Sequence, residues 1–481
     1  MDLKCFDSIS VREPKTSSTR ITAIYVIELK DRKLEFELRN KYDEDISSGL
    51  LDEFAKVMVT LPAVNYGLFS DEIYFDFELN KKDLKLFEDM MEATARDIFV
   101  NRILKHTGLV KDEFIPRVED VRPEDAIPRT SVSAKEVSSR KIVVEGLDFK
   151  KSAVMSSGGK DSLLTYCVLK EVGQEVYPCF FNESGGHWRT ALTAYRYLSS
   201  KDKNTMRVWS NVDRLYNLFD RNMRILETKK LSRKLDIYPI RLFFFEHYVF
   251  SFLPLLYKHR IGNVNLGNEF DDPLCSESEY LGIKHYCAIY DQSQEFDDYM
   301  TSWFRERGFG FRQWSAVRPL SGLLEERILA NRYPEFLRLQ RSCHSVIKRK
   351  GNLVPCGRCS KCLGIITFLL ANDIDPELLG YDAKTVEKYE TMISKSKLNL
   401  DRDELEHALY LARRASRIKT ETGSPHEHIE TLHFHNSCSR PDVVPQELWG
   451  IYEIFEKYSK GYSTIKNGEW CLVSKEEALS I

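Results

Sequence analysis

The sequence has no strong excess of charge of either sign. Its 70 Lys and Arg residues are balanced by 73 Asp and Glu residues, which leaves a formal net charge of −3. Nucleic acids and anionic membrane surfaces attract proteins through basic fields, and no such field is evident here. We therefore expect neither a nucleic acid nor a membrane as partner, and whether the chain acts as a homodimer stays open.

Secretion signals and membrane-spanning runs are lacking as well. The first residues, MDLKCFDSISVREPKT, have no apolar core, so we expect no signal peptide. The most hydrophobic stretch, residues 237–257, includes Arg241, Glu246, His247 and two prolines. A lone membrane span tolerates such residues poorly, so we predict a buried helix. Eleven cysteines without a secretion signal indicate free thiols or metal ligands and a cytoplasmic location.

Internal repeats and low-complexity tracts are also missing, and the pattern divides the chain into four parts. Residues 22–39 alternate apolar and polar side chains and predict a β-hairpin; a helix, a strand over 71–79 and a helix over 81–104 follow. We interpret 1–110 as a small α+β domain. Residues 111–141, rich in Pro, Ser and charge, are interpreted as a linker.

From residue 142 to 375 short apolar runs alternate with helical stretches. This alternation predicts an α/β fold with a doubly wound, mostly parallel, Rossmann-like sheet. Residues 376–481 are charged and rich in aromatic side chains, and predict a mostly helical C-terminal extension that packs rather than stays disordered.

The six residues SGGKDS, Ser157 to Ser162, lie between a predicted strand and a predicted helix. Glycines let backbone N–H groups approach phosphate oxygens, and a helix N-terminus adds positive potential. The two hydroxyls could donate, Lys160 brings a cation, and Asp161 brings a carboxylate for Mg²⁺ or for a helix cap. The spacing fits neither the Walker loop nor G-x-G-x-x-G. A plain connecting turn is the alternative.

Four cysteines are grouped near the end of the α/β region. Cys356, Cys359 and Cys362 form two successive C-x-x-C steps, and Cys343 precedes them by thirteen residues. Four thiolates at this spacing predict a closed tetrahedral Zn²⁺ site, with nearby Lys and Arg side chains to offset its charge. An iron–sulfur cluster or unmetallated thiols are the alternatives.

The loop from Ser157 to Ser162 resembles the S-G-G-x-D-[S/T] signature of the PP-loop ATP pyrophosphatases, which cleave ATP to AMP and pyrophosphate. Together with the cysteines it is similar to two related families, the 7-cyano-7-deazaguanine synthase (QueC)-like proteins and the UDP-N-acetylmuramoyl-L-alanyl-L-glutamate epimerase (MurL)-like family. About 150 residues precede the loop, a layout closer to MurL, and LGNEFDD (266–272) is similar to a Gly-Asn-Glu stretch there.

The resemblance implies an enzyme that uses ATP, Mg²⁺ and Zn²⁺ to adenylate a small carboxylate-bearing substrate. It implies that Gly158, Gly159 and Lys160, with their loop neighbours, bind the nucleotide. The acyl-adenylate could then be epimerised, as for the terminal L-Glu of UDP-MurNAc-L-Ala-L-Glu, or attacked by ammonia in a QueC-like ligase. A nucleobase- or tRNA-modifying enzyme and a nucleotide-binding regulatory module are the other readings.

Residues for the second half of the reaction are expected at the carboxyl ends of parallel strands. We predict Lys160, Asp161 and Glu269 as catalytic and Glu183, His187 and Asn268 as substrate-binding residues. Asp271 and Asp272 are further candidates in the same stretch as Glu269. The alternative for each is a capping or solvated loop residue.

Overall fold

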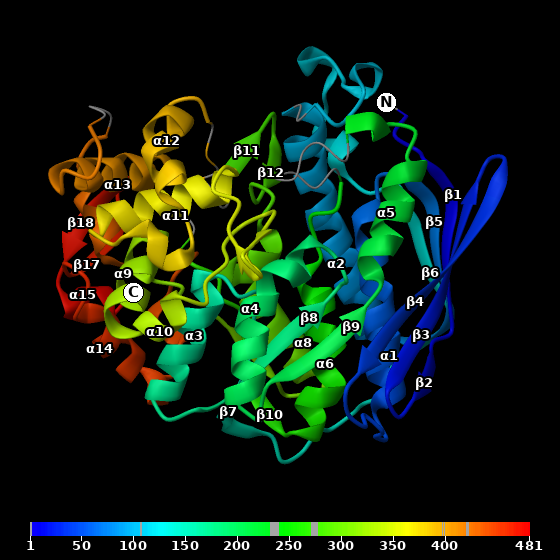
Figure 1. The fold of residues 1–481 in the computed structure, drawn as a ribbon. Helices are drawn as coiled ribbons and strands as arrows, with labels where there is room; N and C mark the ends of the chain where they lie inside the picture. The colour runs from blue at the N-terminus through cyan, green and yellow to red at the C-terminus, as the bar shows by residue number, and fades with distance from the viewer. Residues whose placement is uncertain are drawn as a thin grey trace.

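The computed structural model describes residues 2–105, 108–230, 240–270, 278–396, 398, 400–419 and 423–481. Its centre is a large, mostly parallel sheet with helices on both faces (Figure 1). The predicted α/β class and mostly parallel sheet are therefore confirmed. Among the described residues, no helix has the length and apolar character needed to cross a membrane.

The sheet has 11 strands. In spatial order they are β13 (Arg312–Trp314), β10 (Ile261–Asn265), β7 (Asp148–Met155), β8 (Glu175–Asn182), β9 (Met206–Ser210), β4 (Arg32–Tyr42), β3 (Arg20–Leu29), β1 (Phe6–Arg12), β5 (Ser70–Asn80) and β6 (Ser131–Ser138), with β2 (Lys15–Ser17) paired to β3.

The five strands from β13 to β9 pair in parallel. The chain runs outward from β7 through β8 to β9, and then returns to add β10 and β13 on the other side of β7. The strand order therefore reverses between β7 and β10, and doubly wound sheets bind ligands at the carboxyl ends of the strands beside such a reversal.

Helices pack against both faces of this half. Along β7, Ala153 belongs to one hydrophobic core and Val154 to the other, as expected where successive side chains point to opposite faces. The bounds of these helices are α3 (Lys160–Glu171), α4 (Gly186–Lys201), α5 (Val212–Asn222), α6 (Phe245–Lys258), α8 (Gln294–Arg307), α9 (Gly322–Arg332), α10 (Pro334–Leu337) and α11 (Ser360–Ala371). Helix α6 contains most of the apolar stretch 237–257, and its side chains are largely buried.

The N-terminal part contains the predicted hairpin, β3 paired with β4, and the predicted helices. The first helix is α1 (Leu51–Thr60), which the 3-10 turn η1 (Leu61–Tyr66) follows. The second is α2 (Lys81–Ile98), which continues as a π-helical turn, η2 (Phe99–Leu104). The sheet does not stop at this part, because β4 pairs antiparallel with β9 through Asn40 and Ser210.

The segment 111–141, interpreted from the sequence as a linker, also joins the sheet. After three 3-10 turns, η3 (Asp112–Phe114), η4 (Val118–Asp120) and η5 (Pro123–Ala126), residues 131–138 form β6 parallel to β5. The pattern concealed this strand because β6 is an edge strand with mostly exposed or half-buried Ser, Lys and Glu side chains.

The C-terminal extension packs on the core that contains α3, α9 and α11. It holds the predicted helices and also a small sheet, β16–β17–β18. Its elements are η8 (Pro376–Leu379), α12 (Ala383–Ile393), α13 (Arg402–Arg414), η9 (Glu427–Glu430), β16 (Leu432–His433), η10 (Pro441–Val443), η11 (Gln446–Leu448), α14 (Gly450–Glu456), β17 (Tyr462–Lys466), β18 (Glu469–Val473) and α15 (Lys475–Ala478). The remaining short elements elsewhere are η6 (Thr228–Lys230), η7 (Tyr290–Gln292), and the hairpins β11 (Ser278–Tyr280) with β12 (Ile283–His285) and β14 (Ile347–Arg349) with β15 (Asn352–Val354).

Candidate nucleotide and metal sites

The SGGKDS loop connects β7 to α3 at the carboxyl end of β7, where the strand order reverses toward β10. Gly158 has a φ of +75°, and a Cβ there would lie 3.0 Å from the Cα of Ala191 in α4. Ser157 Oγ accepts a hydrogen bond from the Gly159 N–H at 3.3 Å. Helix α3 begins at Lys160, so its first amide N–H groups point out toward the loop. Ser162 is buried in the same first turn, and its Oγ donates to the Gly159 carbonyl at 3.3 Å. The loop therefore has the backbone geometry of an anion site.

Lys160 is the centre of a carboxylate cluster. Its Nζ lies 2.5 Å from Glu269 Oε2 and 2.9 Å from Glu325 Oε2, and it also binds Asp161 Oδ1. Burial alone would lower the pKa of Lys160, but the three carboxylates outweigh it and raise this pKa well above its usual value. The ammonium therefore stays charged although its side chain is only 7% exposed.

The pKa values of the carboxyls in and beside this cluster are shifted in different directions. Burial disfavours the charge on Asp161, but the Lys160 ammonium outweighs it and lowers the pKa of Asp161. Burial raises the pKa of Glu325, which lies on α9, and it also raises that of Glu269. Glu404, on α13, has its pKa raised to about 8, chiefly by burial and then by the charge of Glu269. The site thus holds more acidic than basic groups.

The three carboxyls that bind the Lys160 ammonium could also hold a metal ion. One oxygen each from Asp161, Glu269 and Glu325 lies within 4.8 Å of the others. The side chains of Asp161 and Glu269 are 33% and 41% exposed, so both are partly accessible to solvent. Carboxylate oxygens are the ligands that Mg²⁺ takes in proteins, usually one or two together with phosphate oxygens. These residues therefore fit that ion.

The loop after β10 brings Glu269 into the cluster through a close backbone contact. A Cβ on Gly267 would lie 2.9 Å from the carbonyl carbon of Asp161, so only glycine fits against the start of α3. Asn268 is buried beside the cluster, and its N–H donates to Ser315 Oγ at 3.1 Å. The remaining candidates of this stretch, Asp271 and Asp272, lie outside the described residues.

Glu183 and His187 form a separate pair at the end of β8. Tyr248 Oη donates to Glu183 Oε2 at 2.7 Å, and His187 Nδ1 lies 3.4 Å from Glu183 Oε1. Burial raises the pKa of Glu183 to about 7. Lys361 acts on both groups: its charge lowers the pKa of His187, after the larger effect of burial, and it also lowers that of Asp161. The structure thus brings Lys160, Asp161 and Glu269 into direct contact, whereas Glu183 and His187 pair with each other.

The four clustered cysteines converge as the spacing predicts. Their Sγ atoms all lie within 4.8 Å of one another, with Cys343 to Cys359 at 3.9 Å and Cys356 to Cys362 at 3.8 Å. A tetrahedral ion with metal–sulfur bonds of about 2.3 Å requires sulfur–sulfur edges of about 3.8 Å. Four thiolates at this spacing could therefore hold one Zn²⁺, whereas a multi-iron cluster distributes its thiolates over separate metal atoms.

The cysteine segment also supports the SGGKDS loop. The Arg341 N–H donates to the Gly158 carbonyl at 2.9 Å, and a Cβ on Gly159 would lie 3.4 Å from Ser342 Oγ. Lys361, between two of the cysteines, lowers the pKa of Asp161 through its charge, after the larger effects of burial and Lys160. A metal at the cysteines would therefore fix residues that contact the loop.

Glu325 and Glu404 were not among the residues predicted from the sequence. Glu325 and Glu326 are adjacent in the run GLLEERILA, which is apolar apart from these two residues and Arg327, and both are fully buried. Two neighbouring acids surrounded by apolar residues on every helical face are a signal that could have marked Glu325. Glu404 carries no such signal, because its contact to the site joins segments 81 residues apart.

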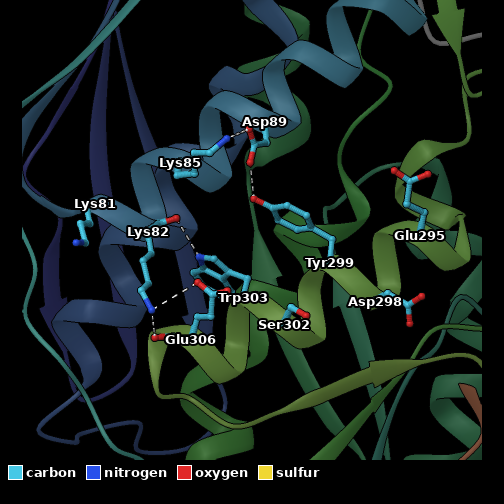
Figure 2. Close-up of a pocket in the computed structure, with 10 residues that line it drawn as sticks. All are labelled: Lys81, Lys82, Lys85, Asp89, Glu295, Asp298, Tyr299, Ser302, Trp303 and Glu306. Atoms are coloured by element: carbon cyan, nitrogen blue, oxygen red, sulfur yellow. Dashed lines mark hydrogen bonds and ion pairs between the residues drawn. The ribbon is translucent and has the colours of Figure 1, made fainter.

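A cavity of about 730 Å³ lies elsewhere, between α2 and α8 (Figure 2). Most of its charged residues are already paired: for example, Lys85 binds Asp89, whose second oxygen accepts from Tyr299 Oη at 2.8 Å. The Trp303 indole N–H donates to the Lys82 carbonyl at 3.2 Å. None of the predicted site residues lines this cavity. We interpret it as a groove between two packed helices.

Comparison with protein-family models and with curated proteins found no match to this chain.

Proposed function

We propose that this protein is an ATP-dependent enzyme that adenylates a substrate carboxylate, releasing pyrophosphate. The observation that carries the proposal is the position of the SGGKDS loop, with its Lys160, at the carboxyl end of β7 where the strand order reverses toward β10. Parallel sheets bind nucleotides at this position, and the spacing of the loop differs from that of loops that deliver a γ-phosphate.

The chain's own groups account for phosphate binding. The Gly158 amide and the N-terminus of α3 would bind the anion, joined by the Gly159 amide once it leaves Ser157 Oγ, and Lys160 would supply a positive charge. Asp161 and Glu325 would hold Mg²⁺, and Glu269 would stay available to the substrate. When bound, this ion would neutralise part of the phosphate charge, which the acidic surroundings of Lys160 otherwise repel.

In the proposed reaction, an oxygen of the substrate carboxylate attacks the α-phosphorus of ATP. The bond from that phosphorus to the bridging oxygen breaks, and pyrophosphate leaves. Loop amides and Lys160 stabilise the charge that grows on the leaving group. The product is an acyl-adenylate, whose α-proton is more acidic than that of the free acid.

Glu269 is the residue that we propose moves that proton, because its side chain is 41% exposed beside Lys160. Its raised pKa lets the carboxyl exchange a proton closer to neutral pH than a free glutamate does. A MurL-like outcome is epimerisation of the terminal L-Glu of UDP-MurNAc-L-Ala-L-Glu or a related acid. A QueC-like outcome is attack by ammonia on the same intermediate.

The test is product analysis with ATP labelled at the α-phosphate, in the presence of Mg²⁺ and candidate carboxylic acids. We expect labelled AMP and an equal amount of pyrophosphate. Lys160→Met should reduce the rate about 100-fold or more. The matched control, Lys170→Met, changes an exposed lysine of the same helix and should retain the rate. Labelled ADP would contradict the proposal, and nucleotide binding without turnover would support a regulatory module instead.

A further inference from the structure

The C-terminal extension contacts two elements that carry carboxylates bound to Lys160. One is α9, which carries Glu325, and the other is the loop after β10, which carries Glu269. Both elements approach Lys160 through close packing, so small displacements of either would change the surroundings of its ammonium.

Helix α9 begins directly against the cluster. A Cβ on Gly322, its first residue, would lie 2.9 Å from Glu269 Oε2 and 3.2 Å from Lys160 Cε. One turn later, Glu325 binds Lys160. The position of the first turn of α9 therefore determines where this carboxylate meets the lysine.

The extension holds this first turn at several points. Glu404 Oε1 accepts a hydrogen bond from the Leu323 N–H at 3.0 Å, and Ser321 Oγ donates to the Ile429 carbonyl at 2.8 Å. Farther along α9, Arg327 binds Glu430 at 2.6 Å. Glu404 thus satisfies an amide at a helix N-terminus that has no partner inside the helix.

The extension also contacts the loop that carries Glu269. The ring of the next residue, Phe270, lies 4.4 Å from the His433 ring and 5.5 Å from the Trp470 ring, measured between centroids. The Phe270 N–H donates to the Leu320 carbonyl at 3.0 Å, beside the start of α9. The two elements are therefore held by the same part of the extension.

We infer that the C-terminal extension is a working part of the Lys160 site, and that Glu404 is a positioning residue that holds the first turn of α9 so that Glu325 and Glu269 meet Lys160. Its oxygen acts as a hydrogen-bond acceptor, a role that the glutamine side chain can also fill. Only the activity readout below rests on the proposed function.

Three variants separate this role from general stability. Glu404→Leu removes the acceptor, Glu404→Gln keeps one, and Glu406→Leu is the control two residues away, where the side chain bonds to Ser424 rather than to α9. The first readout is the rate of acetylation of Lys160 by acetic anhydride, measured by mass spectrometry relative to the exposed Lys203. We expect Glu404→Leu to raise this ratio about fivefold, and the other two variants to stay within about twofold of the wild type.

The second readout is AMP formation from ATP. Glu404→Leu should lower kcat about tenfold while KM for ATP changes less than about threefold, and Glu404→Gln should recover most of the rate. Unchanged labelling in folded Glu404→Leu, or equal effects of Leu and Gln, would overturn the inference. If Glu404→Leu does not fold, Phe270→Leu tests the other contact, and an unchanged labelling ratio there also overturns it. If the wild-type protein forms no AMP, the proposed function is refuted. The acetylation rates then still decide whether Glu404 positions the cluster.

Discussion

Lys160 is surrounded by carboxyls that come from distant parts of the chain. Asp161 is its neighbour in sequence, whereas Glu269 follows β10 and Glu325 lies on α9. Burying one cation among several acids is unfavourable unless each charge is paired, and here one ammonium faces three carboxyls. A bound divalent cation would complete the pairing, which is a physical reason to expect Mg²⁺ before ATP can bind.

Asp291, which lies outside the Lys160 cluster, should make the stability of the protein depend on pH. Its Oδ2 accepts the N–H groups of Phe244 and Phe245 at 3.2 Å each, and burial raises its pKa from 3.8 to about 7. The native state thus holds this proton more tightly than the unfolded state, so the carboxyl's contribution to stability falls as the pH rises from about 4 through 7. Asp291→Asn, which mimics the neutral form, should be more stable than the wild type by about 1–3 kcal/mol at pH 8.

Urea unfolding of both proteins at pH 5 and pH 8 measures this difference. The advantage of Asp291→Asn should shrink at pH 5, where the wild-type carboxyl is protonated in the native state. An advantage that is equal at both pH values would show that the buried carboxyl does not titrate as described.

Among the elements, the loop after β10 depends on one glycine. Gly267→Ala would place a Cβ 2.9 Å from the Asp161 carbonyl carbon and 3.0 Å from the Ser162 nitrogen, and backbone atoms at the start of a helix cannot move aside easily. We expect a loss of about 1–3 kcal/mol in unfolding free energy and a lower rate of AMP formation, because Glu269 shifts with the loop. Gly49→Ala, whose Cβ would meet nothing within 4 Å, is the control and should change neither quantity.

The four clustered cysteines predict that the protein binds zinc. The purified protein should contain one zinc per chain by elemental analysis, and Cys359→Ser should lose it and melt at a lower temperature. Cys471→Ser, in β18, should retain the metal because this thiol lies outside the four-cysteine cluster. Iron in place of zinc, or full zinc content in Cys359→Ser, would contradict the assignment.

Local sequence patterns predicted most helices and strands. Features that depend on contacts between distant segments could not be predicted in this way. The hairpin of β3 and β4 and the alternating strands β7 to β10 have strong periodicity, so their sequences alone indicated them. Lys160 and Asp161 were found because their loop is local. Glu404 reaches the site only through tertiary packing, so no local pattern could mark it. Strand β6 has the mixed polarity of an edge strand, so its sequence did not indicate a strand.

At the scale of the whole molecule, one sheet runs through the N-terminal part and the α/β part. Buried charges reinforce this union: the Arg307 guanidinium of α8 binds Asp83 of α2 at 2.8 Å and Glu53 of α1 at 2.5 Å. Shared strands and shared ion pairs make separate unfolding of the two parts unfavourable. We therefore expect a single cooperative transition for both.

Arg307→Leu tests this coupling. It leaves the nearly fully buried Asp83 without its cation, so we expect a loss of about 3–5 kcal/mol in unfolding free energy. Arg305→Leu, at an exposed position of the same helix, should cost less than about 0.5 kcal/mol. Differential scanning calorimetry should show one transition that moves as a whole, and a shift confined to one of two separate transitions would contradict the coupling.

The central claim, carboxylate adenylation, is tested most directly by isotope exchange. Adenylation is reversible, so labelled pyrophosphate should enter ATP when enzyme, Mg²⁺ and the right acid are present together. The account predicts exchange that requires one carboxylic acid from a set including UDP-MurNAc-L-Ala-L-Glu, and that is abolished in Lys160→Met. Exchange without any acid, or no exchange with any acid in a protein that binds ATP, would contradict it.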